Sequence, residues 1–424
     1  MSRASEEAAR PAGVTPEQDR RNGRLFASTY IFIYFAAPVL YVGVVQAALC
    51  NKLGASATVA NLPTSAYLFG AVAPFALSWL LPHRFDRAVV VAANLVTAAS
   101  MLIVCVTLFL PFSDGVRIAA VVAQGLIQGF SGNISQVYTY QCLGRGTTVE
   151  GRARALKLTF SLSPIWAVAG SLWAQFVLNR GIARLPYPYD FGLLYLIGMP
   201  CAAAVAFLSS RYRLAPVEEE PARPPFVRYL VESIRSYARA RDLVLLWFGY
   251  LLWYCTLNAM SNLSLYTREA VGRDPKELSG VIMALRFGGK ALGGFALGWL
   301  GVRWGVRAPV IGSVVLVGAA TLWAWGAPGY AYLFAFGLMG AGELGGAYFP
   351  NYQVTLSSPA TGARDLALQS LVSPVSSIAP TLHGALTDHF GFRASFAFGV
   401  ATAVAALVLV LRLPARPRRP DASE

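Results

Sequence analysis

The sequence predicts an all-α membrane protein with 12 transmembrane helices arranged as two six-helix bundles. Twelve hydrophobic stretches, each about the 20 residues that a helix needs to cross a bilayer, run through the chain. The 424 residues are 56% hydrophobic and only 13% charged, which is unusual for a soluble protein. The two halves of the chain also repeat one another weakly, which favours two equivalent bundles.

The expected spans fall into two blocks of six, and spans 4, 7, 8, 10 and 11 are less apolar than the others. They cover residues 25–49, 59–81, 88–110, 116–143, 155–178, 191–208, 243–266, 279–300, 308–325, 330–356, 366–387 and 392–411. The domain organisation that follows is a cytoplasmic N-terminal tail at 1–24, bundles at 25–210 and 242–411, a cytoplasmic linker at 211–241 and a cytoplasmic C-terminal tail at 412–424.

The net charge of +14 indicates topology rather than a polyanionic partner. If the N-terminus is cytoplasmic, 25 of the 35 lysines and arginines lie on the cytoplasmic side, eight lie outside and two lie within span 8. This skew is the positive-inside rule. We therefore expect both termini in the cytoplasm, a location in the plasma (cytoplasmic) membrane, the lipid bilayer as a partner and no binding of nucleic acid.

No pattern in the sequence indicates a cofactor, a metal or an enzyme. The five cysteines are scattered without a Cys-x-x-Cys motif, and the three histidines have no ligand spacing. No Walker-type phosphate loop is present, so the chain does not look built to use ATP. We find no paired acids or activated nucleophile at depth, and we expect a monomer without cofactors.

The internal repeat appears in two registers. Residues 75–80 (FALSWL) recur as 295–300 (FALGWL), and the same offset of 220 pairs Arg87 with Arg307. An offset of 212 pairs Tyr140-Gln141 in span 4 with Tyr352-Gln353 in span 10. Matches at corresponding places in each half support two parallel six-helix repeats, an architecture known in transporters.

Residues 226–240 of the linker predict an amphipathic helix. Its apolar residues Phe226, Leu230 and Ile234 share one face, and its charged residues lie elsewhere: Arg228, Glu232, Arg235 and Arg239. Two interpretations stay open at this point, a helix lying on the cytoplasmic membrane surface and a solvated linker helix.

Polarity differs between spans. Spans 3, 6, 9 and 12 are nearly purely apolar, whereas spans 1, 4, 7 and 10 carry tyrosine, glutamine, asparagine and glutamate. Because polar groups cannot face lipid cheaply, we expect spans 1, 4, 7 and 10 to face a wet interior. This pattern resembles the major facilitator superfamily, in which the first, fourth, seventh and tenth helices line a central cavity. The resemblance covers about residues 25–411.

The superfamily's signature loop between helices 2 and 3 corresponds to residues 78–87 (SWLLPHRFDR), where Pro82 replaces the usual acid. The copy in the second half, 298–307 (GWLGVRWGVR), has Val302 at that position. The resemblance implies gating loops, and short basic turns are the alternative. The candidate gating residues are Arg84, Asp86, Arg87, Arg303 and Arg307.

Three formal charges lie deep inside the spans: Arg286, Lys290 and Glu343. Arg286 and Lys290 share one face of span 8, about 10 and 16 Å below its outer end, and Glu343 lies about 20 Å down span 10. We expect Lys290 to pair with Glu343 and Arg286 to lack an acidic partner. The structural alternative makes the pair a simple ion pair and has Arg286 bind carbonyls at a helix break near Gly288 and Gly289.

These residues predict a secondary active transporter that moves a small organic solute, anionic or zwitterionic, by alternating access. A guanidinium group binds carboxylate or phosphate in a bidentate manner, and Glu343 is the sole carboxylate at depth for coupling to protons. Drug or metabolite efflux and a non-transporting receptor or scaffold are the alternatives. The candidate substrate-binding residues are Arg286, Lys290, Tyr34, Gln128, Tyr254, Asn258 and Tyr352.

Overall fold

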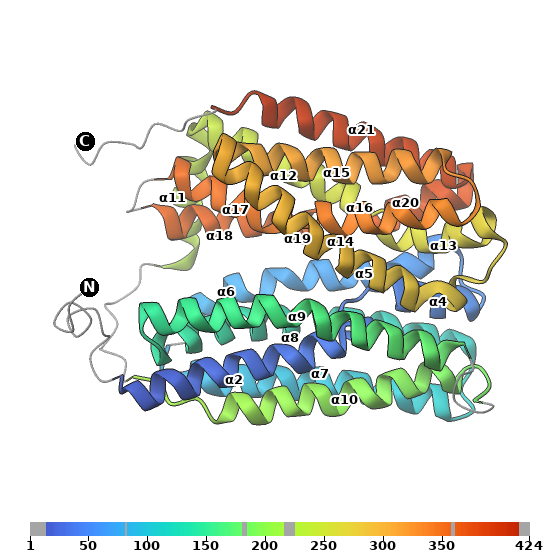
Figure 1. Cartoon of the computed structure of the whole chain (residues 1–424), viewed down its shortest axis with the longest axis horizontal. Coiled ribbons are helices and arrows are strands. Elements are labelled where there is room, and N and C mark those ends of the chain that lie inside the picture. The colour runs from blue at the N-terminus through green and yellow to red at the C-terminus, as the bar shows by residue number, and fades with distance from the viewer. Residues whose placement is uncertain (1–13, 81–82, 180–184, 216–224, 358–360, 415–424) are drawn as a thin grey trace. The chain divides into compact units, whose positions relative to one another are not determined.

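All regular secondary structure among the described residues of the computed structural model is helical (Figure 1). The structure describes residues 14–80, 83–179, 185–215, 225–357 and 361–414. The chain divides into two compact units. Unit 1 comprises Met1–Tyr41 and Ala73–Arg223, and unit 2 comprises Val42–Val72 and Pro224–Glu424.

Unit 1 contains long helices, and two of them, α2 and α9, begin at a threonine that caps the N-terminus. The Thr15 hydroxyl accepts the amide of Gln18 ahead of α2, and the Thr148 hydroxyl accepts the amide of Gly151 at the start of α9, which satisfies amides that have no partner within the helix. The elements are α2 (Pro16–Phe35), α3 (Ala37–Leu40), α6 (Ala73–Leu80), η2 (His83–Phe85), α7 (Asp86–Phe109), α8 (Asp114–Gly146), α9 (Val149–Leu178) and α10 (Tyr189–Ser210).

Unit 2 has more interruptions. It contains α4 (Val44–Lys52), α5 (Ala57–Phe69), η1 (Gly70–Val72), α11 (Phe226–Arg239), α12 (Arg241–Leu257), α13 (Met260–Val271), α14 (Pro275–Trp304), α15 (Arg307–Gly326), η3 (Gly329–Leu333), α16 (Phe334–Gly342), α17 (Gly345–Leu356), α18 (Gly362–Ser370), α19 (Val372–Val375), α20 (Ile378–Phe390) and α21 (Phe392–Leu411).

Seven helices of the described chain are long and apolar enough to cross a membrane, so the chain is an integral membrane protein. They are α7, α9, α10, α12 with α13, α14, α15 and α21. The other five predicted spans coincide with α8, which carries several buried amides, or with helices broken into shorter pieces. Irregular backbone at membrane depth is tolerated where protein surrounds it.

The internal repeat has a structural counterpart in two arginines. Arg87, on α7, donates to the carbonyl of Tyr212 just past the end of α10, 3.2 Å away. Arg307, on α15, donates to the carbonyls of Val410 and Leu411 at the end of α21. A cation at a helix C-terminus satisfies free carbonyls and complements the helix dipole. Corresponding arginines therefore cap the last long helix of each unit.

The segment Val42–Val72, predicted for the N-terminal bundle, belongs to unit 2. Asp388, at the end of α20, accepts the backbone amides of Ala57 and Thr58 at 2.9 and 2.8 Å and the Thr58 hydroxyl at 2.5 Å. Lys52 forms an ion pair with Asp274 at 2.9 Å. Unit 2 thus caps the N-terminus of α5 with a carboxylate from a distant part of the chain.

A buried chain of hydrogen bonds continues this attachment. Asn61 on α5 donates to the amide oxygen of Asn262, and Asn262 donates to Ser395. The ring of His383, which is fully buried, contacts Ser395 at 2.8 Å and the carbonyl of Cys255 at 3.0 Å. Because a carbonyl only accepts, Nε2 donates to the carbonyl of Cys255. His383 therefore links α20 with α12 and α21.

Replacing Asp388 with alanine should weaken the attachment of α5 by about 1 kcal/mol, the usual cost of losing a cap. Burial raises the pKa of Asp388, but the hydrogen bonds from Thr58 and Ala57 outweigh burial, and the pKa lies below the ordinary 3.8. A lowered pKa contributes stability above 3.8 that disappears as the pH falls through the folded value.

The measurement is the thermal unfolding midpoint of the purified protein as a function of pH. We expect native and Asp388→Ala chains to differ near neutral pH and to converge in strong acid. Glu269→Ala removes an exposed carboxylate of α13 and serves as the matched control. An equal loss in both variants would show that Asp388 has no specific role.

Candidate functional site

The three deep charges meet at one carboxylate in unit 2, and we call Arg286, Lys290 and Glu343 the charge triad. Nε of Arg286 lies 2.9 Å from Oε2 of Glu343, and Nζ of Lys290 lies 3.1 Å from Oε1. The side chains are 13%, 26% and 14% exposed in the order Arg286, Lys290, Glu343. Two cations share one anion, so the cluster carries a net positive charge.

Local structure explains how one carboxylate reaches both cations. Arg286 and Lys290 lie one turn apart on the continuous helix α14, and Glu343 lies at the break between α16 and α17. The backbones of α14 and α16 approach closely: a Cβ on Gly289 would collide with the carbonyl of Gly337, and one on Gly340 would collide with the carbonyl of Arg286. Small residues permit such crossings in membranes.

One expectation about the triad is confirmed and one is wrong. The predicted contact between Lys290 and Glu343 is present. The expectation that Arg286 lacks an acidic partner is wrong, since it forms its own ion pair with Glu343. The expectation rested on depths calculated for straight helices. Such depths include neither the break at Glu343 nor the length of the arginine side chain. The structural alternative, in which Arg286 binds carbonyls at a helix break near Gly288 and Gly289, does not apply, because α14 runs through them.

Two tyrosines of unit 2 interact with the triad. Tyr254 on α12 interacts electrostatically with Glu343 and hydrogen-bonds Tyr250 and Ser373. Tyr67 on α5 interacts electrostatically with Tyr254, Arg286 and Glu343. Tyr254 was a sequence candidate, whereas Tyr67 was missed because a single tyrosine in an apolar span carries no spacing signal. The site therefore draws residues from α5, α12, α14, α19 and the break between α16 and α17.

The remaining substrate candidates lie in other surroundings. In unit 1, the ring of Tyr34 lies between those of Tyr30 and Tyr41, with centroids 6.2 and 5.8 Å away, and Gln128 is buried on α8. In unit 2, Asn258 lies at the break between α12 and α13. Tyr352 is fully buried, and its hydroxyl donates to the carbonyl of Pro414 at 2.6 Å, which ties it to the C-terminal segment.

The candidate gating residues make contacts within their own units. Asp86 is buried and forms an ion pair with Arg145 at 2.8 Å, and Arg145 also donates to the carbonyl of Ala215. The guanidinium of Arg84 lies 4.8 Å from the ring centroid of Phe85, and that of Arg303 lies 5.5 Å from Trp299. Arg87 and Arg307 cap helices as described above. Pro82 lies outside the described residues.

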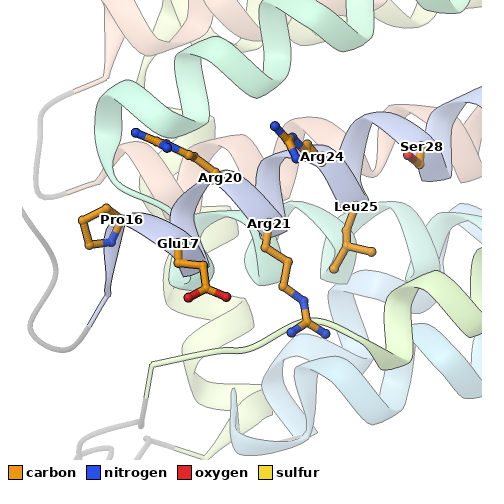
Figure 2. A pocket seen from close by; sticks show the side chains of 7 residues that line it. All are labelled: Pro16, Glu17, Arg20, Arg21, Arg24, Leu25 and Ser28. Atoms are coloured by element: carbon orange, nitrogen blue, oxygen red, sulfur yellow. The ribbon is translucent and has the colours of Figure 1, made fainter.

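A pocket lies along the start of α2 (Figure 2). Its volume is about 590 Å³. Arg20 and Arg24 extend side by side on one side of the helix, and Glu17 and Arg21 extend on the other (Figure 2). Three arginines against one glutamate make the surface electropositive. The residues that line it are Pro16, Glu17, Arg20, Arg21, Arg24, Leu25 and Ser28.

Among the described residues, no three histidine, cysteine or acidic side chains gather as a metal site. The five cysteines are free, and four of them are buried.

Gly289→Ala should separate α14 from α16 and weaken the triad, because the new methyl group collides with backbone that cannot rotate away. We expect a loss of about 1–3 kcal/mol in stability, seen as a lower unfolding midpoint. Gly288→Ala is the matched control, since its Cβ would meet nothing within 4 Å, and it should be neutral or slightly stabilising. Equal behaviour of the two variants would contradict the close crossing.

Comparisons with known proteins agree with this architecture. Residues 262–424 match the sequence model of the Major Facilitator Superfamily. A mutant of the nucleoside transporter NupG is similar over 92% of this chain and 98% of that chain, with a TM-score of 0.70 and 13% identity. A D-xylose-proton symporter is similar over 95% and 98%, with a TM-score of 0.65 and 14% identity.

A POT family transporter in complex with 5-aminolevulinic acid is similar over 95% of this chain and 96% of that chain, with a TM-score of 0.64 and 15% identity. At these identities the likeness shows the fold. Together with the match over residues 262–424, it identifies the chain as an integral membrane protein with the Major Facilitator Superfamily transporter fold.

Proposed function

We propose that the chain is a secondary active transporter for a small organic anion or zwitterion, and that the charge triad binds the substrate's anionic group. The observation that carries this proposal is the ratio of charges: Arg286 and Lys290 share the single carboxylate of Glu343. A net positive charge inside a membrane protein is costly. A substrate carboxylate or phosphate would bring a second anionic group to the two cations and bind them through charge-assisted hydrogen bonds.

The geometry supports an exchange of carboxylates. A substrate anion that reaches Lys290, the most exposed member of the triad, competes with Glu343 for the two cations. Once displaced, Glu343 lies in a low-dielectric site without its partners, where an unpaired charge is expensive. It then takes up a proton from water. When a singly charged anion is bound and Glu343 is protonated, the triad and its substrate together carry the same total charge as the triad without substrate or proton.

The hydroxyl groups of Tyr67 and Tyr254 are suited to orient the substrate or the displaced carboxylate, because both interact with Glu343. The basic pocket on α2 would attract the same class of solute electrostatically. The positive-inside skew supports cytoplasmic termini and a plasma-membrane location. Two similar folds are named as proton symporters, for D-xylose and for fucose, which makes proton coupling the first mechanism to test.

Drug or metabolite efflux and a non-transporting receptor or scaffold remain the competing functions. An efflux protein for apolar compounds would need open aromatic surface. Beside Tyr254, however, Trp253 and Phe349 are fully buried and pack against Tyr250 as core. Solute flux into liposomes separates a transporter from a receptor.

The substrate class is tested by thermal shift of the purified chain against organic acids, amino acids, sugars and cationic drugs. A ligand that binds only the folded state raises the unfolding midpoint. We expect one anionic class to stabilise the native chain and to lose its effect in Arg286→Gln and Lys290→Gln. Arg273→Ala removes an exposed arginine ahead of α14 and is the charge control. Stabilisation by cationic or neutral compounds, unchanged in both variants, would make the triad structural.

Proton coupling is tested with Glu343→Gln. In the native chain, binding of the anion is accompanied by protonation of Glu343. The affinity for the anion should therefore rise as the pH falls. Glutamine removes both the competing carboxylate and the titrating group, so the variant should bind the anion at least as tightly and without dependence on pH. Isothermal titration across a pH series measures this.

Liposome uptake provides the second readout. Accumulation driven by an imposed pH gradient should be lost in Glu343→Gln, while counterflow exchange of substrate continues. A variant that still accumulates substrate on a pH gradient would rule out Glu343 as the proton carrier.

A further inference from the structure

The helix α11, between the two blocks of spans, has three parallel stripes along its length. A helix turns about 100° per residue. Four residues separated by four, three and four positions therefore lie in a row along one side of it. Phe226, Leu230, Ser233 and Tyr237 form the first stripe; Val227, Val231, Ile234 and Ala238 form the second; Arg228, Glu232, Arg235 and Arg239 form the third. The three stripes face successive directions, and we call them the docked, apolar and charged stripes.

The docked stripe attaches α11 to the rest of unit 2. Tyr237 is buried, and its hydroxyl lies 3.2 Å from the amide oxygen of Gln353 on α17. It packs with Leu243 and Leu368, and Leu230 joins the same cluster. The helix contacts α12 and α18 (Figure 1). These contacts set the rotation of α11 and thereby determine which of its sides remain uncovered.

The apolar stripe is left exposed by this docking. Val227, Val231 and Ile234 are 69%, 58% and 49% exposed. Three branched apolar side chains on successive turns form a continuous strip, which is unfavourable in water. The sequence analysis placed Ile234 on the same face as Phe226 and Leu230, whereas the structure places it in the exposed strip.

The charged stripe lies directly beside the apolar one and is basic. It carries Arg228, Arg235 and Arg239 against the single acid Glu232, which pairs with Arg228 at 2.9 Å. Two arginines are thus in excess. On the opposite side of the helix from the apolar stripe lies Ser236, which is exposed and polar.

Chain connectivity places α11 at the edge of the membrane. It ends at Arg239, and the span that begins α12 starts at Arg241, so only Ala240 separates them. A helix joined this closely to a transmembrane segment lies at the height of the lipid headgroups. There, an apolar stripe flanked by arginines matches acyl chains beside anionic headgroups.

We propose that α11 is a membrane-surface helix whose apolar stripe inserts into a leaflet containing anionic phospholipid, while its arginines bind the headgroups. The docked stripe holds the helix to unit 2 and the apolar stripe holds it to lipid. This assigns a lipid-binding surface to the linker, independent of what the charge triad transports. It also decides between the two interpretations of the linker that the sequence left open.

The test uses the full chain in phospholipid vesicles, with an environment-sensitive fluorophore attached to a single introduced cysteine. Val231→Cys reports on the apolar stripe, and Ser236→Cys is the matched control on the opposite side. The unmodified chain, whose five cysteines are mostly buried, measures background labelling. The readouts are the emission maximum, quenching by iodide in water and quenching by doxyl-labelled lipid.

We expect the label at position 231 to emit at shorter wavelength, to be shielded from iodide and to be quenched by doxyl lipid. The label at position 236 should show the reverse. Equal access of iodide to both positions would overturn the proposal in favour of a solvated linker. Shielding from iodide without quenching by lipid would also overturn it, because protein would then cover the stripe.

The requirement for anionic lipid is tested separately. In vesicles of phosphatidylcholine mixed with phosphatidylglycerol, lipid quenching at position 231 should exceed that in phosphatidylcholine alone. The increase should disappear when Arg228, Arg235 and Arg239 are replaced together by glutamine, and high salt should reduce it. An identical signal in both lipids would remove the headgroup part of the proposal.

Discussion

The close crossing of α14 and α16 is the contact on which the candidate site depends. Lipid tails provide no hydrophobic force that drives helices together, so association rests on packing and polar contacts. Gly289 and Gly340 let each backbone reach the other's carbonyls. Only at this separation does Glu343 reach Arg286 and Lys290 together. A wider crossing would leave three charges desolvated without partners, at a cost of several kcal/mol each.

Polar contacts have a second structural role in unit 2. The short helices α4 and α5 bring polar groups to the surface of α13, α20 and α21, and those groups find partners there: Asp388 caps α5, and Asn262 connects Asn61 with Ser395. Hydrogen bonds between buried side chains favour one arrangement of neighbouring helices. This explains why a segment of the first half of the sequence belongs to a compact unit with the second half.

Parts of the candidate site were predictable. Lys290 and Glu343 could be paired from the sequence because their depths in the membrane follow from the rise per residue of a helix. The two depths are similar on spans that run in the same direction. The partner of Arg286 was not predictable, since it depends on the interruption at Glu343 and on side-chain direction. Tyr67 gave no signal in an apolar span. Tyr352 was chosen for its polarity, but the structure uses that polarity to bind the carbonyl of Pro414.

The sequence by itself determined the helical class, the membrane location, the repeat and the amphipathic character of α11, because each follows from local properties: the length of apolar runs, the similarity of short segments and the period of a helix. The tertiary structure alone decided which acid meets which cation, which unit holds Val42–Val72 and which stripe of α11 is covered. In the triad, Glu343 lies 53 positions along the chain from Lys290 and 57 from Arg286. Their meeting depends on how two helices cross and rotate, and no local pattern encodes that geometry.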